Sequence, residues 1–273
     1  MNFLRSEVCR HGKMVWPVSD TTIGKALELY GEFAEGENRV MARYIRPGNL
    51  VVDVGANLGT TVLPASKAVG KDGTVFAFEP QPIIAQCLNT TLSLNDCFNV
   101  RVFSNALGNE QGWGRIPSAG IENSGNHGSN ALGSQGLQVP ILKLDDIELP
   151  SCELIKLDVE GYEWPVLQGA FQQILLHRPV IYLEAKKIKS TNLCIQWLLA
   201  NGWRCYWHFA FFYRRDNFRK NMQNIFGAVG DMNVLAIPNS KQQPDDMPEI
   251  INPNEDWQSV YGPFYQKREM PIP

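Results

Sequence analysis

LVVDVGANLGT, residues 50–60, is the stretch on which the fold of this chain depends. Its first five residues are apolar apart from Asp53, and this composition predicts a strand that is buried on both faces of a parallel sheet. Gly55 and Gly59 predict a tight turn after the strand, where a ligand can lie against the backbone. We expect a helix to begin after this turn, with its unpaired N–H groups directed towards that ligand.

A second apolar run, Val75 to Phe78, is followed by Glu79, which comes 20 residues after Gly59. In doubly wound α/β folds, a carboxylate at the tip of the second strand binds the ribose of a nucleotide. The spacing therefore predicts a cofactor that contains a nucleoside. The turn has neither the third glycine of G-x-G-x-x-G nor the Gly-Lys-Ser/Thr of a phosphate-binding loop, which favours a cofactor without a pyrophosphate.

Strand and helix patterns alternate along the rest of the chain. We expect strands at 50–54, 75–78, 100–103, 139–144, 154–158, 180–184, 203–212 and 234–237. Helices are expected at 23–41 with interruptions at its glycines, and at 60–69, 82–94, 164–176 and about 193–198. This order predicts an α/β fold with a mainly parallel, doubly wound sheet and an antiparallel closing strand.

The chain has 273 residues, enough to bury a large core, and we expect its main domain to span residues 31–238. Residues 1–30 are expected to form an N-terminal helical extension. The polar, Pro-rich residues 239–273 are expected to be a tail that wraps the surface or is disordered. Residues 108–136 are rich in glycine, serine and asparagine, which predicts a functional loop that faces the substrate as a lid.

Composition limits the partners of this protein. A formal net charge of -3 argues against nucleic acid as the main partner. We find no apolar run near the roughly 20 residues of a membrane span, and no secretory signal. The six cysteines are scattered without metal-type spacing, as expected of reduced thiols. We therefore expect a cytoplasmic protein that acts on a small molecule, and the sequence leaves its oligomeric state open.

Acidic residues stand at the ends of four of the five expected parallel strands, namely Asp53, Glu79, Asp158 with Glu160, and Glu184. An acid after a strand often caps the next helix, which is the structural alternative. Ligands of such folds bind outside the carboxyl ends of the strands. Four such acids are more than helix capping alone would explain. They therefore favour a ligand-binding site at this edge of the sheet.

At this point the motifs resemble those of the FkbM family of S-adenosylmethionine-dependent methyltransferases. The resemblance rests on VDVGANLG (52–59), FEP (78–80) and IKLDVEGYE (155–163), of which the last is the most specific, and it extends from about residue 31 to residue 237. It implies a Rossmann-like class I methyltransferase fold. It also implies transfer of a methyl group from S-adenosyl-L-methionine to a hydroxyl of a sugar, polyketide or other small molecule.

The resemblance implies the cofactor-binding residues as well. Those in the first motif would line the amino-acid half of S-adenosyl-L-methionine; they are Asp53, Gly55, Asn57 and Gly59. In the second motif, Glu79 would bind both ribose hydroxyls, and Pro80 follows it. Asn105 and Ala106, after the third strand, would lie beside the adenine.

A hydroxyl acceptor loses its proton when it is methylated, which makes Asp158 or Glu160 the candidate general base. Lys156 would form an ion pair with these carboxylates and keep them charged. Alternatively, Lys156, Asp158 and Glu163 form a structural cluster that braces the strand-to-helix turn. His127 is a further candidate base, because its Gly- and Asn-rich loop is expected to be exposed.

Other hypotheses remain open at this stage. Asp158 and Glu184 end adjacent strands and could hold Mg²⁺ beside a substrate hydroxyl, but no metal ligands are assigned. The Tyr-x-x-x-Lys pattern of Tyr182 and Lys186 is found in NAD-dependent oxidoreductases, yet a strand places these side chains too far apart to act together. A protein that binds the cofactor without turnover is a third possibility. His208 lies in an aromatic run and is expected to pack there.

Overall fold

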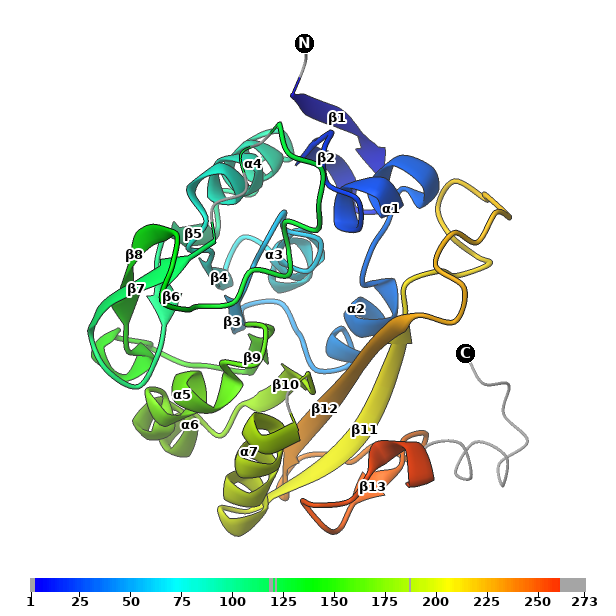
Figure 1. Ribbon diagram of the computed structural model, residues 1–273. Coiled ribbons are helices and arrows are strands. Elements are labelled where there is room, and N and C mark those ends of the chain that lie inside the picture. The colour runs from blue at the N-terminus through cyan, green and yellow to red at the C-terminus, as the bar shows by residue number, and fades with distance from the viewer. Residues whose placement is uncertain (1–2, 118–119, 121, 187, 261–273) are drawn as a thin grey trace.

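The computed structural model describes residues 3–117, 120, 122–186 and 188–260. The strands of its central sheet are, in chain order, Leu50–Val54 (β3), Thr74–Phe78 (β4), Val100–Phe103 (β5), Leu154–Leu157 (β9), Val180–Glu184 (β10), Trp203–Phe211 (β11), Gly230–Pro238 (β12) and Glu249–Ile250 (β13). In space they follow the order β13-β11-β12-β10-β9-β3-β4-β5 (Figure 1).

The direction of the strands agrees with the prediction of a mainly parallel sheet. Strands β3, β4, β5, β9 and β10 are parallel, whereas β12 is antiparallel to both of its neighbours, β10 and β11. Val54 pairs with Phe78 on one side and with Leu157 on the other. The residues that follow these three strands therefore meet at one edge of the sheet, which we call the carboxyl edge.

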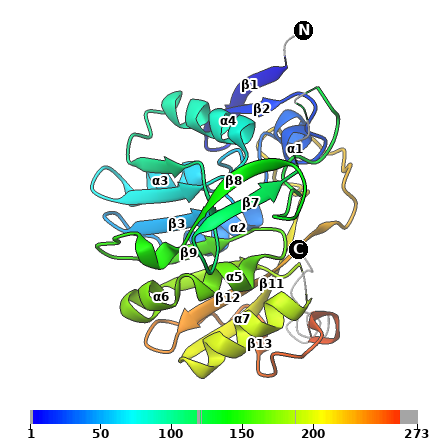
Figure 2. The ribbon, with the colours of Figure 1, turned by 60° about the vertical axis from the view of Figure 1, so that its left-hand side comes forward.

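Helices cover both faces of the sheet. Helices α2 (Glu35–Met41), α3 (Val62–Val69) and α4 (Pro82–Ser93) cover one face, with α1 (Ile23–Tyr30) beside them, and α5 (Glu163–Gln168), α6 (Phe171–His177) and α7 (Ile188–Ala200) cover the other (Figures 1 and 2). Because successive strand residues point to opposite faces, Val51 packs in the core below α3 and Val52 in the core below α5.

Two of the predicted helices are each divided in two. Gly31, at a φ of 68°, ends α1 in the left-handed conformation, and its N–H bonds to the carbonyl of Leu27. The predicted helix at 164–176 is divided at Gly169, between α5 and α6. A Cβ on Gly169 would lie 1.9 Å from the carbonyl oxygen of Gly108, so close backbone contact with the neighbouring segment interrupts the helix here.

The expectation of a helical extension over residues 1–30 is wrong for residues 4–17. They form a hairpin of Leu4–Cys9 (β1) and Gly12–Pro17 (β2), and only α1 is a helix. Strand β2 packs on α4: Trp16 is buried, and the N–H of Val15 donates to the hydroxyl of Thr91 at 3.1 Å. The hairpin thus depends on contacts with a helix 76 residues later in the chain.

A small second sheet has the order β6-β8-β7, with Ala106–Leu107 (β6), Gly112–Ile116 (β7) and Leu137–Leu142 (β8). Strand β7 lies within residues 108–136, so this segment is not a loop throughout. A 3₁₀ helix, Leu144–Asp146, follows β8. The end of this sheet that carries β6 adjoins the carboxyl edge, because Ala106 follows β5 by two residues.

The segment from residue 239 is ordered in its described part. Strand β13 pairs with β11, which buries Ile250, and Trp257 stacks on Phe209 with ring centroids 5.9 Å apart. The predicted surface tail therefore adds an edge strand to the sheet, and residues 261–273 lie outside the described residues. Among the described residues, we find no helix with both the length and the apolar character needed to cross a membrane.

Candidate functional site

A cavity with about 1080 Å³ of empty volume, part of it open to solvent, lies at the carboxyl edge of the sheet. Most of the residues predicted as site residues line it: Gly55, Asn57, Glu79, Pro80, Asn105, Ala106, Lys156, Asp158 and Glu160. Three others do not face it, namely Asp53, Gly59 and His127. The fold therefore brings together residues that are about a hundred positions apart in sequence.

The Gly-rich turn after β3 runs directly against the end of β9. Gly55 has a φ of 83°, and a Cβ there would lie 1.8 Å from the carbonyl oxygen of Asp158. Any side chain would push these two strand ends apart, so only glycine fits. Asn57 is left-handed as well, and its side-chain oxygen accepts the N–H of Leu58 at 2.7 Å.

Glu79 follows β4 with only 3% of its surface exposed. Its carboxylate accepts the backbone N–H of Asn57 at 3.0 Å and that of Gln81 at 2.8 Å. Burial raises the pKa of Glu79 to about 7, although these two hydrogen bonds act to lower it. The side chain of Gln81 also contacts this carboxylate, and because a carboxylate has about four acceptor positions, capacity for a hydroxyl donor from the cavity remains.

A buried lysine joins the strand ends beneath the turn. Lys156 Nζ lies 3.5 Å from Asp53 Oδ1 and 3.1 Å from Asp158 Oδ2. Asp53 is buried and also accepts the hydroxyl of Thr61. Burial works to lower the pKa of Lys156, but the carboxylates of Asp158, Asp53 and Glu37 outweigh it and raise that pKa. Lys156 is therefore a buried ammonium held between carboxylates.

Gly59 supports the turn from the side away from the cavity. It has a φ of 88°, and a Cβ there would lie 2.6 Å from Leu88 Cδ1 of α4. The absence of a side chain at Gly59 thus allows the turn to pack closely against α4.

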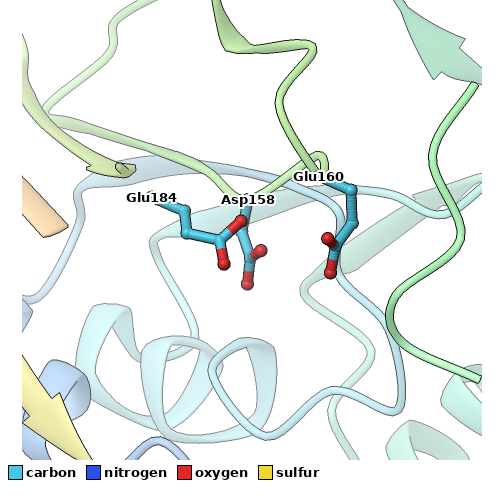
Figure 3. Close-up of side chains that lie close together, drawn as sticks. All are labelled: Asp158, Glu160 and Glu184. Carbon is cyan, nitrogen blue, oxygen red and sulfur yellow. The ribbon is translucent and has the colours of Figure 1, made fainter. Parts of the chain in front are cut away.

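Asp158, Glu160 and Glu184, which we call the acidic cluster, follow or end β9 and β10 (Figure 3). One carboxylate oxygen from each lies within 4.8 Å of the others. Lys186 Nζ is 2.5 Å from Glu160 Oε2 and 3.5 Å from Glu184 Oε1. Burial, with the carboxylates of Asp158 and Asp231, raises the pKa of Glu184 to about 10. The cluster thus gathers three carboxyl groups on one wall of the cavity, where burial and mutual repulsion favour the protonated form of Glu184.

Sequence reasoning missed two acidic residues of this wall. Glu37 of α2 is buried and accepts a hydrogen bond from Asn233 Nδ2 at 3.3 Å, and burial raises its pKa to about 8. Asp231 lies near the start of β12, and burial beside Asp158 raises its pKa to about 7. Because β12 is antiparallel, its start and not its end meets the carboxyl edge. The expected antiparallel closing strand could therefore have predicted that Asp231 lies at this edge.

His127 is 4% exposed, so the expectation that it is exposed is wrong. Its Nε2 lies 3.0 Å from Ser19 Oγ, and its carbonyl accepts the side-chain N–H of Gln81 at 3.0 Å. The residue thus anchors its loop to the N-terminal segment. His208 packs as expected: its Nδ1 is 2.7 Å from the hydroxyl of Tyr182, and burial lowers its pKa to about 4.

The alternative of a cluster formed by Lys156, Asp158 and Glu163 fits only in part. Glu163 is fully buried and accepts the N–H of Gly161 at 2.8 Å. The hydroxyl of Ser190 donates to its other oxygen at 3.4 Å. Glu163 therefore braces the strand-to-helix turn through its own contacts, while Lys156 and Asp158 line the cavity.

Two further walls close the cavity. Residues 126, 128, 130 and 132 line it, and the hydrogen bonds that hold this loop in place include Thr21 N–H to the carbonyl of Gly125 at 3.0 Å and Asn130 Nδ2 to Gln81 Oε1 at 2.8 Å. Phe33 and Phe212, with ring centroids 5.0 Å apart, add an aromatic wall. The cavity thus has a loop over its Gly-rich turn and aromatic rings beside its acidic wall.

Comparison with known proteins agrees with this geometry. A family model described as Methyltransferase FkbM domain matches residues 53–206, which is more than half of the 273-residue chain. A search of curated proteins finds no significant match.

Solved structures of methyltransferases resemble this one. An S-adenosylmethionine-dependent O-methyltransferase from Thermotoga maritima has a TM-score of 0.51 and 11% identity, over 88% of this chain and 79% of that chain. A putative O-methyltransferase from Klebsiella pneumoniae has a TM-score of 0.50 and 14% identity, over 81% and 91%. FkbM methyltransferase from Methylobacillus flagellatus KT has a TM-score of 0.47 and 17% identity over 72% of this chain, which spans 50% of that chain. The fold is thus the Rossmann-like fold of S-adenosylmethionine-dependent methyltransferases.

Proposed function

The chain belongs to the FkbM methyltransferase family, and on this premise we propose that it methylates a hydroxyl group of a sugar, polyketide or related small molecule. Its family is one of S-adenosylmethionine-dependent enzymes, so the cofactor is S-adenosyl-L-methionine, which supplies a methyl group on a positively charged sulfur. Membership of this family argues against the alternative hypothesis of an NAD-dependent oxidoreductase. What we propose beyond the family is the class of acceptor molecule and the hydroxyl oxygen as the methylated atom.

The Gly-rich turn and Glu79 support the proposed cofactor half of the cavity. The backbone of Gly55 and Asn57 is open to a ligand there, because neither position projects a long side chain over the turn. The acceptor capacity that Glu79 keeps beyond its two backbone hydrogen bonds suits the hydroxyls of a ribose. Pro80, Asn105 and Ala106 line the same part of the cavity, where we propose that the adenine binds. We assign Asp53 and Gly59 to the support of this turn.

One observation carries the proposal of a hydroxyl acceptor: a partly exposed carboxylate faces the cavity beside a buried ammonium. The side chain of Asp158 is 40% exposed, while Lys156, 3.1 Å away, is 5% exposed. Lys156 contacts one oxygen of this carboxylate, Oδ2. An acceptor O–H would donate a hydrogen bond to this carboxylate, which orients the oxygen for attack and takes its proton.

The aromatic wall supports a ring-shaped acceptor. Phe33 and Phe212 line the cavity near Glu37 and the acidic cluster. The apolar face of a sugar or polyketide ring can pack on such side chains while its hydroxyls reach the carboxylates. We further propose that the loop at residues 122–132 acts as the lid over the cofactor half of the cavity.

A methyl-transfer assay with Asp158→Asn tests this function. We incubate the protein with radiolabelled S-adenosyl-L-methionine and a panel of hydroxylated sugars and polyketides, and locate the methyl group by mass spectrometry. Asp158→Asn should lower kcat by about 100-fold or more, the usual contribution of a general base, and should still bind S-adenosylhomocysteine. Asp72→Asn, an exposed turn residue, is the matched control. Full activity of Asp158→Asn, or a methyl group on nitrogen or carbon, would refute the proposal.

A further inference from the structure

We propose that the acidic cluster of Asp158, Glu160 and Glu184 binds a divalent cation that prefers oxygen ligands, such as Mg²⁺, Mn²⁺ or Ca²⁺. The cation would hold the acceptor hydroxyl. Its binding stands on the geometry of the cluster alone, whereas this role rests on the proposed function.

The spacing of the carboxylates fits such an ion. One oxygen from each of the three side chains lies within 4.8 Å of the others. Ca²⁺ binds oxygen at about 2.3 to 2.6 Å, so two ligands on opposite sides of it are about 5 Å apart; Mg²⁺, at about 2.1 Å, brings them to about 4.2 Å. Separations within 4.8 Å therefore stay inside the span of the larger ion, and the carboxylates would have to move closer together to contact the smaller one at the outer limit of that range. Three carboxylates without histidine or cysteine select a hard cation.

A buried atom without a partner gives the second observation. Glu184 is 6% exposed, and its Oε2 has no hydrogen-bond partner among the described residues. Its carboxyl group points towards that of Asp158, not away from the cluster (Figure 3). A buried carboxylate oxygen that nothing satisfies is costly in a folded protein, unless a ligand completes it. A cation between Glu184 and Asp158 would supply that partner.

The acidic side chains that line the cavity near the cluster outnumber the basic ones, which favours the binding of a cation. Five acidic side chains line it near the cluster, namely Glu37, Asp158, Glu160, Glu184 and Asp231, against the two ammonium groups of Lys156 and Lys186. Burial raises the pKa of Glu37, Glu184 and Asp231, so an incoming cation would displace protons from this wall. Lys156 is shared with Asp53 as well. Lys186 contacts the cluster from a side chain that is 43% exposed, so it can turn towards solvent when a cation enters.

A cation at this place has a defined chemical use. The acceptor hydroxyl would bind it and become more acidic, as water does on a metal ion. The O–H proton would pass to the carboxylate oxygen of Asp158 that does not contact the cation. The acceptor oxygen then forms the new bond to the methyl carbon, and the electron pair of the broken carbon–sulfur bond stays on sulfur.

Calorimetric titration of the EDTA-treated, full-length protein with Mg²⁺, Mn²⁺ and Ca²⁺ tests the site without any acceptor. We expect one cation per chain, and at least tenfold weaker binding in Glu184→Gln. Glu110→Gln, an exposed loop residue, is the control and should bind as the unchanged protein does. Lys186→Met should bind the cation several-fold more tightly, because the competing ammonium is gone.

The outcomes separate this inference from the proposed function. No binding of any of the three cations by the unchanged protein and Lys186→Met would overturn the site, as would unchanged binding by Glu184→Gln. If only amine-bearing acceptors bind at the cluster, it is an ammonium site and the inference is wrong. Binding together with methyl transfer that EDTA does not reduce would refute the cation's role, while hydroxyl methylation would still stand.

Discussion

Replacing Lys156 by methionine should lower the free energy of unfolding by about 3 kcal/mol. Removal of one partner from a buried ion pair leaves the other charge unpaired, which costs about 3 to 5 kcal/mol. Here the cost falls on Asp53, because it is buried while Asp158 remains accessible to water. Thr61 still donates its hydroxyl to Asp53, which favours the lower end of that range.

Urea denaturation at pH 7, followed by tryptophan fluorescence, measures this loss by linear extrapolation. Lys189→Met, an exposed position on α7, is the control for loss of a positive charge and should change stability by less than about 0.5 kcal/mol. Asp53→Asn removes the orphaned charge, so the double variant should be at least about 1 kcal/mol more stable than Lys156→Met alone. A loss below about 1 kcal/mol in Lys156→Met, or a double variant no more stable than it, would refute the idea that this ion pair holds the strand ends together.

Two further predictions concern the cofactor and pH. Glu79→Ala should weaken S-adenosylhomocysteine binding in calorimetry by at least tenfold, because the ribose hydroxyls lose their acceptor and the turn loses its bond at Asn57 N–H; equal affinity would disprove the assignment. His208, with its pKa lowered to about 4 by burial, stays neutral in the folded protein while the unfolded chain takes up a proton below its ordinary pKa of about 6.5. Stability should therefore fall by roughly 3 kcal/mol as pH drops from about 6.5 to about 4, and His208→Gln should lose that part of the slope in urea titrations at several pH values; an unchanged slope contradicts it.

The sequence predicted the parts of the fold and site that depend on short spacings. Residues 50–60 are a strand and a Gly-rich turn, and Glu79 ends up beside Asn57 because the two parallel strands start in register. The FkbM motif at 155–163 likewise placed Lys156 and Asp158 at the same edge. In each case the relevant neighbours are adjacent strands of one sheet, whose parallel direction the α/β alternation already implies.

The features that sequence reasoning missed depend on contacts between distant segments. His127 looked exposed because its loop is rich in glycine and asparagine, but its burial comes from Ser19, more than a hundred residues earlier. The hairpin at residues 4–17 packs on α4, where the N–H of Val15 donates to Thr91. Glu37 belongs to the cavity because α2 lies beside the first half of β12, where Asn233 donates to Glu37. None of these pairings has a local signature.

The position of Lys156 argues that the two halves of the cavity are coupled. One ammonium serves Asp53, under the Gly-rich turn, and Asp158, on the acidic wall. The Cβ that Gly55 lacks would strike the carbonyl of Asp158, so the same two strand ends also touch through their backbones. A shift of the turn when a cofactor binds would therefore move Asp158 directly. This arrangement gives Lys156 a role in the FkbM-like motif: a shorter or neutral residue at position 156 would leave the proposed cofactor half and the proposed acceptor half without a shared charge.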